Sequence, residues 1–307
     1  MPTRSWWVQP KRGTVVSMTT LTNCPHARTF KQADAIASAK TYVLVHGAYG
    51  GGWIWRDVAA GLRALGHSAW TPTLTGLGER AHLLPGQITI GTHIRDVAGL
   101  IMAEELTGVI LVGHSYGGMV VTGVADHMPD RVRHVVYLDA LIPEDGDTAF
   151  ALLPPGLADS RRAAAREQGR GLALPVPGPD VFPIPDGPAK DWFMRRLCPH
   201  PVGSYDSPIR LARPAGAGLP VTYVAYTTPP LASIEPSRRR ARSKPGWRYL
   251  ELAVPHDVQV ATARGGGRSA SRHRLMVFQL GEAARPALAW WQRTPWRTSA
   301  CQSAAAP

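Results

Sequence analysis

The chain has 307 residues, of which 44% are hydrophobic and 18% are charged. This apolar content is sufficient for one large core, and the 31 glycines and 28 prolines are too few for a low-complexity sequence. The formal charge of +12 comes mostly from arginine, without the regular aromatic interleaving of a single-strand nucleic-acid binder. A solvated arginine-rich surface is therefore favoured over a polyanion-binding one, and no nucleic-acid partner is expected.

The cysteines and the hydropathy pattern argue against several other classes. Cys24, Cys198 and Cys301 are far apart and form no CxxC pair, which argues against a disulfide framework or a zinc site. We expect neither a metal nor a cofactor. Because no apolar run approaches about 18 residues, no membrane span is predicted. A cytoplasmic location is the expectation, with secretion as the alternative, and the oligomeric state stays open.

The first half of the chain alternates between strand and helix patterns once residue 41 is reached. Residues 1–40 have no sustained hydrophobic period, which predicts a poorly ordered N-terminal extension. The elements predicted after it, in chain order, are a strand over 42–45, a glycine-rich turn over 46–52, a helix over 53–65, a strand over 68–71, a helix over 92–106 capped by Thr92, a strand over 109–112, a helix over 116–127 and a strand over 132–138.

The alternation stops over residues 141–218, which are rich in proline and contain short helical patterns near 158–168 and 189–198. A stretch of this length without strands is too long for a loop, which predicts an inserted cap. A strand over 221–226, an arginine-rich helix near 232–243 and a strand over 247–253 follow. Residues 264–307 form an atypical C-terminal tail, predicted to be partly helical near 275–292.

This order of elements predicts an α/β fold with a six-stranded, mainly parallel core sheet flanked by helices. Strand–helix–strand units require parallel strands joined by right-handed crossovers. The six core strands lie near residues 42, 69, 110, 135, 223 and 250. The predicted core therefore comprises residues 41–140 and 219–263, with the cap inserted between them.

A candidate nucleophile lies at the end of the third strand, in the sequence Gly113-His114-Ser115-Tyr116-Gly117. Gly-x-Ser-x-Gly between an apolar strand and a helix is the nucleophile-elbow pattern. The serine must occupy a sharp turn, so the residues two positions away must lack side chains that would clash. The helix N-terminus also directs backbone N–H groups toward the hydroxyl. We therefore predict that Ser115 is a nucleophile.

The turn after the first strand, His46-Gly47-Ala48, is predicted to lie beside Ser115. The carboxyl ends of parallel strands meet at one edge of a sheet, so the two turns are neighbours. Acyl transfer needs two backbone donors for its oxyanion. The predicted donors are the N–H groups of Tyr116 and Ala48, and His46 is interpreted as a residue that braces the loop.

The predicted general base is His256, because it is the only histidine between the last strand and the C-terminal tail. In this architecture the acid follows the serine and precedes the histidine. Asp139 ends the strand next to Ser115 and is the predicted acid. The region after strand 221–226 has no carboxylate until Glu235, and the nearby residues Glu144, Asp145 and Asp147 also remain candidates for the acid.

With these motifs the chain resembles α/β-hydrolase-fold serine carboxylesterases, in particular bacterial esterases, including pyrethroid hydrolases, that are related to plant methyl esterases and hydroxynitrile lyases. The resemblance runs from about residue 41 to 263. The segments that carry it are His46-Gly47-Ala48-Tyr49 with Trp53, the stretch 73–80, the elbow Gly113–Gly118, the stretches 138–140 and 143–146, Gly246-Trp247-Arg248-Tyr249 and His256-Asp257.

The resemblance implies hydrolysis of small-molecule esters through an acyl-enzyme, with Ser115, His256, Ala48 and Tyr116 in the roles given above. The predicted cap would roof the substrate pocket, and its apolar residues indicate a hydrophobic ester; they include Leu152, Leu153, Phe182, Trp192 and Phe193. Plant relatives carry the acid after the penultimate core strand, where this chain has a Thr/Pro run, so the acid stays open between Asp139 and its competitors. Hydroxynitrile lyases have a Thr after the first-strand His and a Lys after the catalytic His, where this chain has Gly47 and Asp257. A lyase is therefore a weaker alternative, and the presence of both Ser115 and His256 argues against a non-catalytic ligand receptor.

Overall fold

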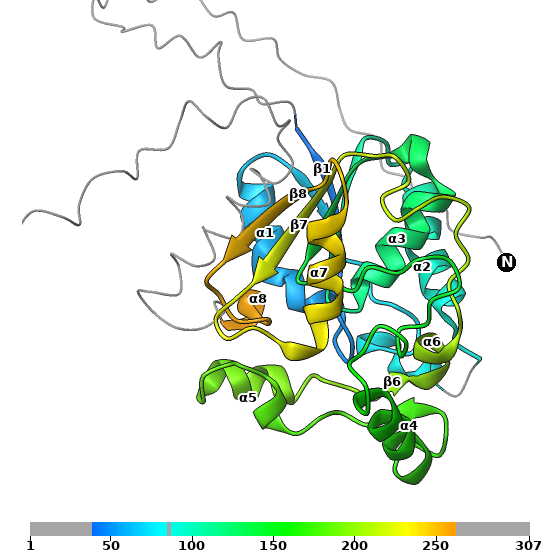
Figure 1. Ribbon diagram of the computed structural model, residues 1–307. Helices are drawn as coiled ribbons and strands as arrows, with labels where there is room; N and C mark the ends of the chain where they lie inside the picture. The colour runs from blue at the N-terminus through cyan, green and yellow to red at the C-terminus, as the bar shows by residue number, and fades with distance from the viewer. Residues whose placement is uncertain (1–38, 85–86, 262–307) are drawn as a thin grey trace, which may run out of the picture. The chain divides into compact units, whose positions relative to one another are not determined.

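The computed structural model describes residues 39–84 and 87–261 and is built on a six-stranded parallel sheet (Figure 1). The strand order is β2-β1-β3-β4-β7-β8, and every neighbouring pair is parallel. The predicted α/β fold and its six strands are thus confirmed. Their bounds are Thr41–Val45 (β1), Ser68–Trp70 (β2), Val109–His114 (β3), Val132–Leu138 (β4), Val221–Tyr226 (β7) and Arg248–Leu252 (β8).

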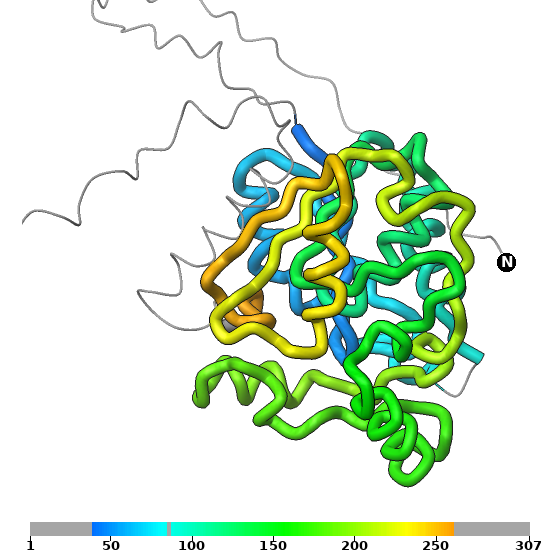
Figure 2. The backbone as a smooth tube through the Cα atoms, viewed as in Figure 1, coloured from blue at the N-terminus to red at the C-terminus, as the bar shows by residue number. Residues whose placement is uncertain are grey.

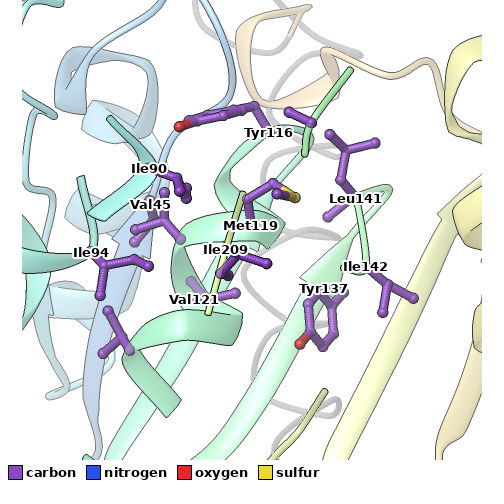
Figure 3. Packing of buried hydrophobic residues seen from close by; sticks show 14 of the residues in the cluster. Val45, Ile90, Ile94, Tyr116, Met119, Val121, Tyr137, Leu141, Ile142 and Ile209 are labelled. Carbon is purple, nitrogen blue, oxygen red and sulfur yellow. The ribbon is translucent and has the colours of Figure 1, made fainter. Parts of the chain in front are cut away.

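The sheet separates two hydrophobic clusters, because successive side chains of a strand point to opposite faces. Val43 and Val45 of β1 pack with α2 and α3 on one face, whereas Tyr42 and Leu44 pack with α1 on the other. Figure 3 shows part of the first cluster, including Val45. All six residues of β3 are buried, which explains its continuous apolar run.

Helices cover both faces of the sheet, with α7 on the same face as α2 and α3 and with α8 on the face of α1. Their bounds are Arg56–Ala64 (α1), Ile90–Ala103 (α2), Gly117–His127 (α3), Glu235–Ser243 (α7) and Val258–Ala261 (α8). Short 3-10 helices cover Gly52–Trp55, Gly78–Leu83, Pro129–Arg131, Pro179–Val181 and Ala232–Ile234. The predicted helix over 53–65 is therefore a 3-10 turn followed by α1.

The start of α2 differs from the prediction. Thr89, not Thr92, is the N-cap, and the helix begins at Ile90 and ends at Ala103. The Thr92 N–H donates to the Thr89 hydroxyl at 3.4 Å, while the Thr89 N–H donates to the Thr92 hydroxyl at 3.2 Å. Thr92 is thus the reciprocal member of a capping box, a role that glutamate or glutamine usually fills.

Residues 157–206, the middle of the segment between β4 and β7, lie beyond the carboxyl ends of the strands (Figures 1 and 2). It contains Leu157–Glu167 (α4), Ala173–Leu174 (β5), Pro188–Met194 (α5), His200–Pro201 (β6) and Val202–Asp206 (α6). The expectation of no strands here is wrong, because β5 and β6 form a short antiparallel pair. Short helices near 158–168 and 189–198 were correctly predicted.

The predicted cap boundaries, 141–218, fall inside packed structure. Leu141, Ile142 and Ile209 all belong to the same buried cluster as the sheet, so both ends of this segment contribute to the core. The division into core and cap stays a prediction. The predictions of an N-terminal extension and a C-terminal tail mainly concern residues 1–38 and 262–307, which lie outside the described residues. In the described ranges no helix is both long enough and apolar enough to cross a membrane.

Candidate active site

Ser115 lies in the turn between β3 and α3, with φ at +54°, in the left-handed region that side chains other than glycine rarely occupy. Two backbone hydrogen bonds hold it there. The Ser115 N–H donates to the Leu138 carbonyl at 3.2 Å, and the Leu141 N–H donates to the Ser115 carbonyl at 3.0 Å. The end of β4 therefore supports the strained turn that presents the hydroxyl.

The glycines around Ser115 allow β1, β3 and α3 to approach closely. A Cβ on Gly113 would lie 2.7 Å from the Gly117 carbonyl oxygen, and one on Gly117 would lie 2.8 Å from the carbonyl oxygens of Val45 and His46. Real Cβ atoms are essentially never found so close to a backbone oxygen. The elbow pattern thus reflects the packing of this helix on the sheet as well as the turn itself.

His256 follows β8 and hydrogen-bonds to Asp139, which follows β4. The His256 Nδ1–H donates to Asp139 Oδ2 at 2.6 Å, and both side chains are buried. Ser115 and His256 line the same cavity. The structure therefore brings together three of the predicted site residues, from turns that are far apart in the sequence.

The carboxylates that competed with Asp139 for the acid role contact other groups. Their partners are Arg238 at 3.5 Å and Arg242 at 3.6 Å for Glu235, Lys244 at 3.1 Å for Glu144, the Leu211 N–H at 2.9 Å for Asp145, and Arg240 at 2.8 Å for Asp147. Asp139 is the carboxylate that orients the imidazole in this geometry.

Arg238 of α7 is a site residue that the sequence reasoning missed. Its Nε donates to Asp139 Oδ1 at 2.8 Å and its Nη2 donates to Oδ2 at 2.9 Å, and its side chain is 3% exposed. From the sequence we expected the arginines of the chain to form a solvated surface. The available signal was spacing, since Ile234, Arg238 and Ala241 are buried on one face of the turn and helix.

The buried charges shift the pKa values of the pair in opposite directions. Burial would raise the pKa of Asp139, but the hydrogen bond and charge of His256 and those of Arg238 outweigh burial and lower it. Burial would lower the pKa of His256, but the Asp139 hydrogen bond and the charges of Asp257 and Asp139 raise it above 6.5. Asp139 is thus held ionised beside an imidazole that readily accepts a proton.

The predicted oxyanion donors, Ala48 and Tyr116, also line the cavity. Neither of their backbone N–H groups donates a hydrogen bond to any residue of 39–84 or 87–261. A Cβ on Gly47 would lie 3.0 Å from the Cβ of Ser115, so the turn after β1 contacts the elbow. Two unsatisfied donors beside the hydroxyl are what an oxyanion requires.

His46 braces this turn. Its Nδ1–H donates to the Gly47 carbonyl at 2.7 Å, and its Nε2 accepts from the Leu74 N–H at 3.1 Å. With both nitrogens used in this way the ring is neutral, and burial lowers its pKa to about 4. These contacts fit the interpretation of His46 as a loop brace.

Two further buried histidines contact Tyr116 and the turn after β1, and neither was predicted from the sequence. The Tyr116 hydroxyl donates to His93 Nδ1 at 2.9 Å, and His93 Nε2–H donates to the Thr75 carbonyl at 2.9 Å. The Tyr49 N–H donates to His200 Nδ1 at 3.3 Å. Burial lowers the pKa of His93 to about 4 and that of His200 well below 6.5.

The cavity has a volume of about 550 Å³, the size of a pocket for a drug-sized ligand. Its apolar lining includes Leu153, Phe182 and Phe193, three of the side chains expected to form the substrate roof. Leu152 and Trp192 were expected there as well, but they pack in the two hydrophobic clusters.

A cluster of two histidines and one carboxylate lines part of the cavity. Ligand-type atoms of His114, His256 and Asp257 lie within 4.8 Å of one another. The His114 Nε2–H donates to the His256 carbonyl at 2.9 Å, and its Nδ1 accepts from the Gln259 amide at 3.1 Å. Because both His114 nitrogens are engaged, we interpret the cluster as the surroundings of the base.

Residues 42–267 match the Alpha/beta hydrolase family. The chain is 45% identical over 230 residues to a carbendazim hydrolyzing esterase from Nocardioides sp., covering 71% of this chain and 93% of that protein. It is 33% identical over 138 residues to a pyrethroid hydrolase from Sphingobium wenxiniae, covering 42% and 48%. An extracellular alpha/beta-hydrolase from a Paenibacillus species superposes with a TM-score of 0.68 at 24% identity, covering 80% of this chain and all of that one. The predicted resemblance to esterases is confirmed.

Proposed function

Because the chain belongs to the alpha/beta hydrolase family, we propose that it is a serine carboxylesterase that works through an acyl-enzyme intermediate. The observation that carries the proposal is the 2.6 Å hydrogen bond between His256 and Asp139 at the cavity that Ser115 lines. An oriented imidazole beside a hydroxyl on a strained turn is the arrangement that activates a serine.

The proposed reaction has two steps. His256 removes the Ser115 proton as the hydroxyl attacks the ester carbonyl, and Asp139 stabilises the imidazolium that forms. The N–H groups of Ala48 and Tyr116 bind the oxyanion, and losing one such donor typically costs about 3 kcal/mol of transition-state stabilisation. His256 then gives its proton to the leaving alcohol, and later activates the water that cleaves the acyl-enzyme.

The proposed substrates are small esters with a largely hydrophobic body. The apolar lining of the cavity supports this, and so do the names of the relatives that hydrolyse carbendazim and pyrethroids. We propose that α4 to α6 act as the cap that covers the substrate, and that the enzyme acts in the cytoplasm.

A cyanide-releasing lyase is a weaker candidate. The resemblance implies that such lyases place an ammonium after the catalytic histidine, whereas this chain has the buried carboxyl of Asp257. Burial raises the pKa of Asp257, and its Oδ2 has no hydrogen-bond partner among the described residues. No cation at this position is available to stabilise a departing cyanide.

Replacement of Ser115 tests the proposal. We expect Ser115→Ala to abolish hydrolysis of p-nitrophenyl esters and labelling by a serine-directed phosphonate, with no change in thermal unfolding. Ser160→Ala is the matched control, because it removes another hydroxyl from the same cavity and leaves the elbow intact. Turnover that survives Ser115→Ala contradicts the assignment. Ligand-induced stabilisation of the wild type without turnover would instead support a receptor.

A further inference from the structure

One strong cation lines the cavity without a carboxylate to balance it. Arg161 lies on α4, on the cap side of the cavity that Ser115 also lines. In the described part of the chain Arg161 forms no ion pair, and the groups that act on its charge are the hydroxyls of Tyr49 and Tyr205. The charges acting on Asp257, which lines the same cavity, are those of His256 and Asp139.

The two tyrosines position Arg161 but leave its charge uncompensated. Arg161 Nη1 donates to the Tyr49 hydroxyl at 3.5 Å, a long hydrogen bond. Both phenols are buried, and burial raises their pKa values above 10, so they stay neutral. Arg161 also hydrogen-bonds to the Tyr205 hydroxyl. A guanidinium has five N–H donors in a fixed fork, so these two hydroxyls do not use all of them.

The neighbouring arginine shows what a paired cation looks like on the same helix. Arg162 contacts Asp159 at 3.6 Å and Asp206 at 3.3 Å, and its guanidinium lies over the ring of Phe150. Arg162 does not line the cavity. The two arginines therefore differ in their carboxylate partners. Arg162 contacts two carboxylates of the protein, whereas Arg161 contacts none among the described residues.

We propose that Arg161 binds a carboxylate carried by the substrate at a distance from the scissile ester. The preferred substrates would then be esters with an apolar body and one terminal carboxylate, such as half-esters of dicarboxylic acids. Arginine recognises a carboxylate through paired N–H···O bonds, and partial removal from water strengthens such a contact. Tyr49 directly follows the oxyanion donor Ala48, so the contact would connect the carboxylate site to the reacting end.

The proposal rests on the proposed esterase activity, and the test separates the two. The substrates are two matched pairs of p-nitrophenyl esters: adipate half-ester with hexanoate, and suberate half-ester with octanoate. Each pair has one acyl length and differs in a terminal carboxylate or methyl group. The measurement is the ratio of kcat/KM within each pair, with KM and kcat determined separately and the uncatalysed rate subtracted.

We expect Arg161→Gln to lower the half-ester to alkyl-ester ratio about tenfold or more, chiefly by raising KM for the half-ester. Arg161→Lys retains the charge and should restore part of the ratio. Arg162→Gln removes the same charge from the same helix and should leave the ratio unchanged. Added salt should lower the wild-type ratio in at least one pair.

Three results would overturn the proposal. Equal losses on both members of each pair in Arg161→Gln would assign Arg161 a purely structural role through Tyr49. An equal fall of the ratio in Arg162→Gln would indicate general charge attraction instead of a site. Wild-type turnover of the alkyl esters alone would refute the carboxylate site but keep the esterase, whereas turnover of no ester would refute both.

Discussion

Arg238 of α7 is buried and Arg161 of α4 is partly buried, and the two arginines differ in their partners. Arg238 reaches Asp139 with two nitrogens at 2.8 and 2.9 Å. Arg161 contacts neutral tyrosine hydroxyls. Arg238 is therefore paired with a carboxylate of the protein, whereas the charge of Arg161 has no carboxylate partner among the described residues.

This difference in partners indicates different roles: Arg238 would position the catalytic groups, and Arg161 would bind substrate. A buried ion pair with several hydrogen bonds holds one geometry, since breaking it leaves a charge in a poorly solvated place. Asp139 accepts from His256, from two nitrogens of Arg238 and from the Tyr226 N–H at 3.3 Å. An unpaired cation at a cavity can instead contact whatever carboxylate enters. The following changes test this comparison, in order of decreasing effect.

Removing the charge of Asp139 should have the largest effect. We expect Asp139→Asn to lower kcat about 10⁴-fold on p-nitrophenyl hexanoate, because the amide favours the wrong tautomer of His256 and does not stabilise the imidazolium. Glu235→Gln is the matched control and should change kcat less than about threefold, since that side chain contacts arginines of α7. Similar mild losses in both variants would mean that neither carboxylate orients the base.

Replacing the two arginines compares their structural roles directly. Arg238→Gln should lower the free energy of unfolding by about 3 kcal/mol, because it leaves Asp139 buried with one cation fewer. Arg161→Gln should lower it by less than about 1 kcal/mol, because it breaks no ion pair. Urea unfolding at neutral pH measures both values. Equal destabilisation by the two variants would remove the distinction between them.

The smallest expected effect is a shift of the pH–rate profile. The base must be neutral to accept a proton, and the pKa of His256 is raised, so kcat/KM should fall with decreasing pH through a midpoint above 6.5. The charge of Arg238 lowers the pKa of His256. Arg238→Gln should therefore move this midpoint to higher pH, by up to about one unit. A midpoint that stays fixed or falls would contradict the assigned electrostatics.

The sequence was sufficient for features whose cause is local. The apolar residues of β3 and the glycines of the elbow predicted a buried strand that leads into a turn and a helix, and Ser115 lies there. Asp139 was placed by strand order, since neighbouring parallel strands end at one edge. These inferences need only periodicity and topology.

Features that depend on side-chain packing between distant segments could not be predicted in the same way. Arg238 looked like one of several exposed arginines, because its partner lies 99 residues earlier in the sequence. His200 reaches the Tyr49 N–H across 151 residues. The β5–β6 pair is too short to show alternation, and the Thr89–Thr92 capping box lacks the usual glutamate. Their physical causes are contacts that exist only after folding.

The buried neutral histidines His46 and His93, which contact the turn after β1 and Tyr116, determine how the protein responds to acid. The pKa values of His46 and His93 fall from 6.5 to about 4 on folding, so the unfolded chain binds more protons between these limits. Each residue then weakens the fold by up to about 1.4 kcal/mol for every unit of acidification. Protonation of His256 begins at higher pH, so mild acidification should inactivate the enzyme reversibly. Loss of the folded turn should occur at lower pH, where His46 and His93 are protonated, and activity should then return only after refolding.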